Sequence, residues 1–300
     1  MKDRAFIALG IILLGLAALW PFGLSARWTQ RIQPGWSWNS SFIGVATFPD
    51  PTTGTFPAKD AMSTTERRIA VVSVDQAAGA VMLEDRYIVK DPLTGQTTWE
   101  YVYRAPVDPQ NGAHLDEKYR GDYFVFPREV EKKTYRLRYS YLKSVPVAFQ
   151  REEQIEGITT YLFSYRGRGE YTEAYGGTAD YPGTKVQPGQ EIKCADDQFV
   201  FNVWVEPLTG EMLKVDESCT SGDYVFDIAT GKPLTAIERW SGVTIGDDII
   251  RRGEQIRSER TTYLWASRYL PVGLLIAGLV SFGLGALRNR KRKIRYVEPA

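Results

Sequence analysis

The two ends of the chain are long apolar runs, whereas the middle alternates between apolar and polar residues. Residues 5–26 (AFIALGIILLGLAALWPFGLSA) contain no charged residue, and neither do residues 269–287 (YLPVGLLIAGLVSFGLGAL). A helix rises 1.5 Å per residue, so about 20 apolar residues cross a hydrocarbon core about 30 Å thick. Neither run has the polar face that a surface helix turns to water. The pattern predicts transmembrane helices at 5–26 and 269–287, with buried core helices as the alternative.

Basic residues flank both runs on their outer sides. Lys2 and Arg4 precede the first run, and the second is followed by six: Arg288, Arg290, Lys291, Arg292, Lys293 and Arg295. Cytoplasmic flanks of membrane helices carry such an excess of positive charge. We therefore expect a two-span protein of the cell (inner) membrane, with residues 1–4 and the basic tail 288–300 in the cytoplasm and residues 27–268 outside it. The tail can also attract anionic membrane lipid.

The first run has a second interpretation, as a signal peptide cleaved after Ala26. A cleavage site needs small residues, and Leu24 stands where one is wanted. The run is also long for a signal core, so an uncleaved signal anchor is the favoured interpretation. Both interpretations place the central region outside the cytoplasm.

The middle of the chain predicts a β-rich domain. From Ile69 onward, short runs rich in Val, Ile, Tyr, Phe and Trp are separated by turn residues. We count about ten strands joined mainly by hairpins. The fold class is therefore mainly β (α+β), a twisted antiparallel-sheet extracytoplasmic domain flanked by two transmembrane helices. Residues 27–65 contain several prolines, and we expect them to be irregular.

One turn sequence occurs twice, as DPLTG at 91–95 and EPLTG at 206–210. Pro92 and Pro207 preset φ near the start of a turn, and Gly95 and Gly210 tolerate a positive φ at its end. Each copy stands between two strand-like runs. The repeat therefore predicts two hairpin turns of one type, with a duplicated ligand loop as the alternative.

Cys194 and Cys219 flank the second of these turns at similar distances. Hairpin partners lie at equal distances from the turn, so we expect the two cysteines to be nearly opposite and to form a disulfide in an oxidising exterior. Such a bond would contribute about 3 kcal/mol. A metal site would lack ligands, because His114 is the only histidine in the sequence.

The last part of the central region has a different periodicity. Ile249, Ile256 and Tyr263 recur at seven-residue intervals, and Asp247 or Asp248 is a candidate N-cap. This pattern predicts a helical stalk from about residue 247 that leads into the second apolar run.

Charge and motifs exclude several classes of function. The chain is formally +1; the two flanks account for +1 and +5, which leaves −5 for the region between them. A mildly acidic domain argues against a nucleic-acid partner. The sequence lacks a phosphate-binding loop, a nucleophile elbow and paired metal-binding histidines, so we expect no cofactor and no enzymatic activity.

Three features leave alternatives open. The acidic pairs Asp196-Asp197 and Asp247-Asp248 suit carboxylate sites for hydrolysis or calcium, although solvated turns or caps are the expected reading. We expect His114 to lie in a surface loop. The Gly- and Tyr-rich segment 167–189 either packs over a sheet edge or forms a rim that binds a glycan or a partner.

Three stretches carry a resemblance to a known family. They are YFVFPREVEKKTYRLRY (123–139), EGITTYLFSY (156–165) and VWVEPLTGEML (203–213). With the two apolar runs, they resemble the porin PorA-like family of bacterial envelope proteins, which has a helix at each end and an external domain. The resemblance implies this architecture and assigns no catalytic residue.

Two functions follow as expectations. The first is a membrane-anchored protein whose external domain binds an envelope lipid, a glycolipid or a protein partner. The alternative is a subunit of an oligomeric channel or transporter, because two helices in one chain enclose no pore. Membrane lipid is a partner in both cases, and a homo-oligomer is expected in the second.

Overall fold

The computed structural model describes residues 2–22, 25, 29–50, 52–138, 141–172 and 190–295. The chain divides into two compact units. One comprises residues 31–256, and the other comprises residues 1–30 together with 257–300.

Residues 31–256 form one ten-stranded sheet in which every neighbouring pair is antiparallel. Its order is β4-β3-β2-β1-β10-β9-β8-β7-β6-β5. The strands are β1 Ser37–Thr47, β2 Met62–Asp75, β3 Ala80–Lys90, β4 Thr97–Val107, β5 Thr134–Leu137, β6 Val145–Ile155, β7 Ile158–Glu170, β8 Ile192–Val205, β9 Met212–Asp227 and β10 Pro233–Thr244. The predicted mainly β fold with an antiparallel sheet is confirmed.

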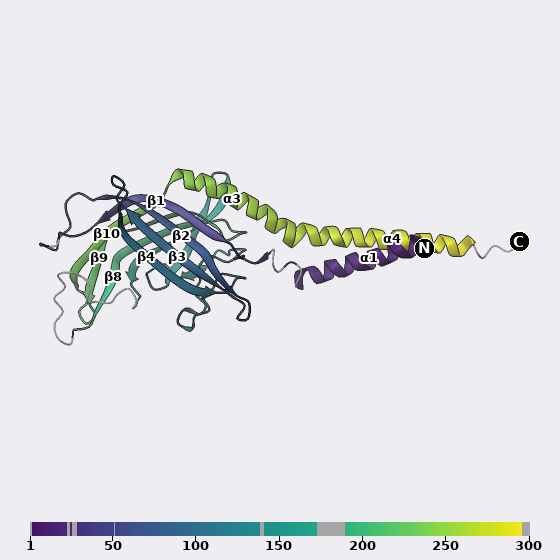
Figure 1. Cartoon of the computed structure of the whole chain (residues 1–300), viewed down its shortest axis with the longest axis horizontal. Coiled ribbons are helices and arrows are strands. Elements are labelled where there is room, and N and C mark those ends of the chain that lie inside the picture. Colours follow the sequence, from purple (N-terminus) through teal and green to yellow (C-terminus); the bar gives the residue numbers. More distant parts are fainter. Residues whose placement is uncertain are drawn as a thin grey trace. The chain divides into compact units, whose positions relative to one another are not determined.

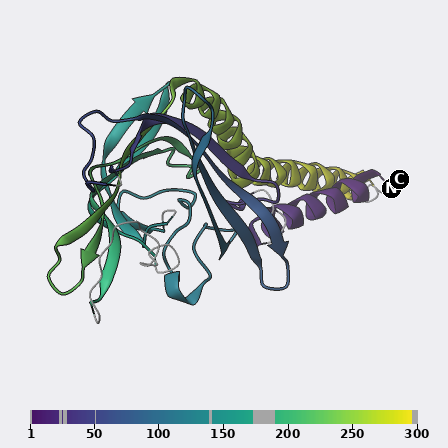
Figure 2. The same cartoon turned by 60° about the vertical axis from the view of Figure 1, so that its left-hand side comes forward.

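The prediction of an irregular segment at 27–65 is wrong for β1 and for the first residues of β2. β1 begins at Ser37 and is an interior strand, paired with β2 on one side and β10 on the other, as Figures 1 and 2 show. The prolines that suggested irregular structure lie before and after this strand. Gly44 marks a close approach within the sheet, because a Cβ there would lie 2.0 Å from the Ser241 carbonyl oxygen.

The sheet curves around a core that is unusually aromatic. The segment between β4 and β5 passes through the interior of this curve (Figure 2), and its residues Phe124, Val125 and Phe126 are buried. Phe126 packs against Tyr135 and Phe163, with ring centroids 5.3 and 4.9 Å away. The core therefore lies on the concave side of the sheet.

The helices are α1 Lys2–Leu19, α3 Gly246–Leu264 and α4 Leu270–Arg295, with short 3₁₀ turns η1 Trp20–Phe22 and η2 Glu117–Tyr119 and a π-helical turn, η4 Trp265–Tyr269. α1 ends before the predicted limit of Ala26 because Pro21 follows its last turn, and proline disfavours helical geometry at the residue before it. In α3, Asp248 accepts a hydrogen bond from the Ser41 backbone N–H and pairs with Arg251. These contacts give Asp248 a structural role.

In the unit formed by the two chain ends, α1 and α4 lie side by side and run antiparallel. Phe6 of α1 lies under the Arg288 guanidinium of α4, at 5.0 Å. Beyond the other end of α1, the Trp20 indole donates a hydrogen bond to the Ala266 carbonyl oxygen at 2.7 Å. One helix of the described residues, Gly246–Arg290, is long and apolar enough to cross a membrane, while α1 is a shorter apolar helix.

Candidate functional site

The two repeated pentapeptides are hairpin turns with the same backbone hydrogen bond. The Gly95 N–H donates to the Asp91 carbonyl oxygen in the turn between β3 and β4, and the Gly210 N–H donates to the Glu206 carbonyl oxygen between β8 and β9. In each turn, the side chain of the first residue also accepts the N–H of the fourth. Both glycines have a positive φ, 71° and 75°.

The same turn is used elsewhere in the chain. Gly54, Gly112 and Gly231 each donate their N–H to the carbonyl oxygen of an aspartate four residues earlier, and each has a positive φ. Those aspartates are Asp50, Asp108 and Asp227. Five uses of one turn in different surroundings indicate a folding device rather than a repeated ligand loop.

The two copies of the pentapeptide turn differ in their surroundings: the first is exposed and the second is buried. Leu93 is 94 % exposed, and a Cβ added to Gly95 would meet no atom within 4 Å. In contrast, Thr209 is fully buried, and a Cβ on Gly210 would lie 2.1 Å from the Pro127 carbonyl oxygen. The turn at 206–210 is therefore part of the interior.

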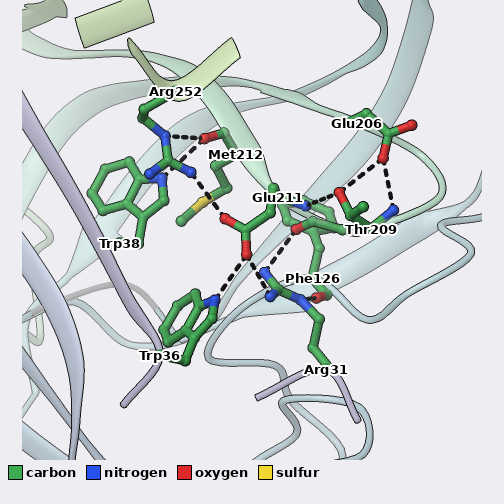
Figure 3. Close-up of polar contacts among 10 residues, drawn as sticks. Arg31, Trp36, Trp38, Phe126, Glu206, Thr209, Glu211, Met212 and Arg252 are labelled. Carbon is green, nitrogen blue, oxygen red and sulfur yellow. Dashed lines mark hydrogen bonds and ion pairs between the residues drawn. The ribbon is translucent and has the colours of Figure 1, made fainter. Parts of the chain in front are cut away.

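Immediately after this turn, Glu211 lies between two buried arginines (Figure 3). Arg31 Nη1 is 2.6 Å from Glu211 Oε1, and Arg252 Nη2 is 2.9 Å from Glu211 Oε2. The Trp36 indole donates a further hydrogen bond to Oε1 at 2.9 Å. All three charged residues are at most 4 % exposed.

The backbone accepts further hydrogen bonds from the two arginines. Arg31 donates to the Phe126 and Gly210 carbonyl oxygens at 2.7 and 3.0 Å, and Arg252 donates to the Met212 carbonyl oxygen at 2.8 Å (Figure 3). Burial raises the pKa of Glu211, but the two guanidinium groups outweigh it and lower that pKa to about 2. The cluster therefore joins the segment before β1, the β8–β9 hairpin and the start of α3.

The sequence analysis missed this cluster. Arg31 and Arg252 are 221 positions apart, and nothing in a local pattern separates them from surface arginines. The only sequence signal is the glutamate that follows the second pentapeptide, where Gln96 follows the first.

The predicted disulfide is not formed. Cys194 faces Val225 on β9, whereas Cys219 faces Trp240 on β10. Cys219 thus lies six residues from the partner of Cys194, about 20 Å along the strand. A disulfide needs Cα atoms within about 7 Å.

The prediction failed because the midpoint between Cys194 and Cys219 in the sequence lies two residues from the centre of the turn. Hairpin partners are mirror positions about that centre, so an offset of two residues at the midpoint displaces Cys219 by four residues along its strand. Register shifts within the β8–β9 pair increase the separation further. Cys219 instead donates its thiol to the Asp197 carbonyl oxygen at 2.8 Å, and burial raises its pKa.

Three carboxylates lie in a row across the concave face of the sheet. Asp196 on β8 faces Asp223 on β9, and Asp223 faces Glu238 on β10. Asp196 and Asp223 are fully buried, and neither carboxylate oxygen of Asp196 has a hydrogen-bond partner. The expectation that Asp196 lies in a solvated turn is wrong, because the strand continues through it.

The charges in this row disfavour one another. Burial and the neighbouring carboxylates raise the pKa of Asp196 far above its ordinary value. Burial raises the pKa of Asp223 to about 6, although Tyr171 and Trp240 donate hydrogen bonds to its Oδ2 at 2.8 and 3.1 Å. Burial and the charge of Asp223 raise the pKa of Glu238 to about 8. Like charges directly opposite one another destabilise a sheet.

A pocket adjoins the acidic row. It has about 60 Å³ of space open to water and is lined by the carboxylates Glu217 and Glu238 and by aromatic side chains. Those aromatic side chains are Phe42, Tyr87, Trp99, Tyr141, Tyr171 and Trp240. Since one water needs about 10–15 Å³ on this measure, the pocket holds several waters or one small organic group.

The acidic row predicts that stability falls as pH rises. Above about pH 4 the unfolded chain releases protons that the folded protein retains, on Asp223 up to about pH 6 and on Glu238 up to about pH 8. Because Glu238→Gln removes one charge from the row, we expect a gain of about 1–2 kcal/mol at pH 8 and little change at pH 4. Urea unfolding of the full-length protein in detergent at both pH values measures this. Glu100→Gln, at an exposed site, serves as the control, and an equal pH slope in both variants contradicts the assignment.

His114 is buried and only 1 % exposed, so the expected surface histidine is wrong. Its ring lies 5.4 Å from Phe124 and 5.7 Å from Tyr119, and burial lowers its pKa to about 4. No group of three or more His, Cys, Asp or Glu within the described ranges is placed to hold a metal ion.

The remaining candidate residues, the basic residues that follow Leu287, belong to the unit formed by the two chain ends. Arg288 and Arg290 lie in α4, and the helix continues through the other four basic residues to Arg295. Most of the Gly- and Tyr-rich segment, residues 173–189, lies outside the described residues.

A family comparison decides the identity. The Porin PorA family matches residues 4–287, which is nearly the whole chain. This chain belongs to the Porin PorA family. No curated protein matches it in sequence. The suspected resemblance is therefore confirmed, and the apolar helix agrees with a membrane protein.

Membership of the Porin PorA family changes the balance between the two expected functions. It favours a porin-like envelope protein, which was the alternative, over an external domain dedicated to a lipid, glycolipid or protein ligand.

Proposed function

We propose that this Porin PorA member is a subunit of an oligomeric envelope channel in which helices from several chains enclose the pore. The observation that carries the proposal is the family match over residues 4–287. A single chain supplies at most two spanning helices, and two helices leave no lumen between them. Conduction therefore requires several copies. We expect no enzymatic activity.

The charged outer surface of the sheet supports a helical pore. β2, β3 and β4 carry the ion pairs Arg86–Glu100, Lys90–Glu66 and Arg104–Glu84 on side chains that are partly or largely exposed. The lipid-facing side of a membrane barrel is an apolar band. These strands therefore suit contact with water rather than lipid.

In the proposed topology, α1 and the apolar part of α4 cross the inner membrane, and residues 27–268 lie outside the cytoplasm. α4 has 26 residues and α1 has 18, which correspond to about 39 and 27 Å. The antiparallel pairing of Phe6 with Arg288 supports placing both chain ends on one side. The six basic residues after Leu287 support placing that side in the cytoplasm.

Glycines bring α1 and α4 into close contact. A Cβ on Gly10 would lie 2.7 Å from the Phe282 backbone nitrogen, and one on Gly278 would lie 2.8 Å from Leu14 Cγ. Small residues permit such approaches between membrane helices. We therefore expect Gly278→Leu to destabilise the pair by about 1–3 kcal/mol.

Spin labels on Leu9→Cys and Leu284→Cys, at sites 46 and 44 % exposed, test this pairing by pulsed electron paramagnetic resonance. Gly278→Leu should broaden the distance distribution or lengthen the distance. Gly283→Leu is the matched control, because a Cβ at Gly283 would meet nothing within 4 Å. Equal effects of the two substitutions would refute the packing.

Native mass spectrometry and single-channel recording on the full-length protein test the proposed function together. We expect one defined oligomer and discrete conductance steps in a planar bilayer. A monomer that gives no conductance at any protein density would overturn the proposal.

A further inference from the structure

We propose that the pocket beside the acidic row binds a small organic ammonium ion, held by carboxylates on one side and aromatic faces on the other. This inference does not depend on the channel function. It rests on Glu238, the member of the row that lines the pocket, and on the composition of the pocket walls.

The first observation is a row of buried or half-buried carboxyl groups without a cationic partner. Within the described parts of the chain, no lysine or arginine forms an ion pair with Asp196, Asp223 or Glu238, whereas the buried carboxylates Asp85 and Glu211 each pair with arginine. Buried charges are normally paired, because leaving water is costly. A positive ligand would supply the missing partner.

The second observation is the buried carboxylate of Asp196. It is fully buried, it faces Asp223, and neither of its oxygens has a hydrogen-bond partner. Buried polar atoms without a partner are rare in proteins. Asp196 does not itself line the pocket, so a cation held there by Glu238 would act on it through the shared row. The raised pKa of Asp196 is consistent with an incomplete site.

The third observation selects the kind of cation. The carboxylates are not grouped closely enough to hold a metal ion within the described residues. An ammonium ion has weaker distance requirements, and aromatic faces attract it within about 6 Å. Five aromatic residues whose rings can supply such faces line the pocket, together with the carboxyl groups of Glu238 and Glu217: Tyr87, Trp99, Tyr141, Tyr171 and Trp240. Carboxylates beside aromatic rings match a cation bearing methyl groups.

The test compares choline with its neutral carbon isostere, 3,3-dimethylbutan-1-ol, by isothermal titration calorimetry. The full-length protein is kept in a maltoside detergent at pH 8, so that no detergent carries a choline group. We expect choline to bind at least tenfold more tightly than the isostere. Equal affinities, or no binding of choline up to tens of millimolar, would overturn the proposal.

Two variants make the result specific to the pocket. Glu238→Gln should weaken choline binding about tenfold and leave the isostere unchanged, whereas Glu100→Gln, on the exposed surface, should change neither. Because Glu238→Gln removes repulsion, we expect it to stay folded, which circular dichroism verifies. Retention of full choline affinity by folded Glu238→Gln contradicts the site, as does competition by calcium at equal concentration.

Discussion

Replacing Glu211 with glutamine is expected to destabilise the β domain by about 3–5 kcal/mol. The amide keeps the shape of the side chain but removes the charge between Arg31 and Arg252, which are at most 2 % exposed. Two buried guanidinium groups would then lack a counter-charge, which is among the largest penalties in a folded protein. Urea unfolding of full-length protein in detergent, followed by tryptophan fluorescence, measures the change.

The matched control for this prediction is Glu100→Gln. Glu100 also pairs with an arginine, Arg86, but both side chains are more than 40 % exposed. Exposed pairs contribute about 0–1 kcal/mol. A loss at Glu211 that is no larger than the loss at Glu100 would show that the buried cluster does not hold the domain together.

A combined substitution distinguishes two contributions to the free energy of unfolding: the loss from leaving buried charges unpaired, and the net stabilisation by the intact ion cluster. If Arg31→Met and Arg252→Met accompany Glu211→Leu, no charge is left unpaired. Buried ion networks replaced whole by apolar residues are often neutral or stabilising. We therefore expect the triple variant to be more stable than Glu211→Gln alone.

The second large effect is expected at Gly210. Gly210→Ala meets a positive φ of 75° and places a Cβ 2.1 Å from the Pro127 carbonyl oxygen. Backbone strain of about 1 kcal/mol and overpacking of about 1–3 kcal/mol sum to about 2–4 kcal/mol. The thermal unfolding midpoint of the full-length protein should fall accordingly.

Gly95→Ala isolates the backbone contribution, because Gly95 has nearly the same φ, 71°, and nothing within 4 Å of an added Cβ. It should cost about 1 kcal/mol. Equal losses at the two glycines would mean that the packing of residues 126–127 on the second turn contributes nothing.

The turns and the cysteines show which features the local sequence pattern predicts and which it does not. Asp91 and Gly95 form a turn whose hydrogen bonds all lie within six residues, so sequence alone is sufficient to predict it. The pairing of Cys194 depends instead on the register of a long hairpin with irregularities, and small shifts moved Cys219 about 20 Å from it along the strand. β1 was missed because its place between β2 and β10 depends on a partner almost 200 residues later.

The sequence by itself determined the apolar ends, the antiparallel strands and the repeated turns, because composition, alternation and neighbouring residues control these features. It did not determine which turn is buried, which arginines meet Glu211, or that three carboxylates share one row. Those outcomes depend on strand order and register across the whole sheet, which bring together residues far apart in the chain. The tertiary structure alone therefore decided the buried ion cluster and the acidic pocket.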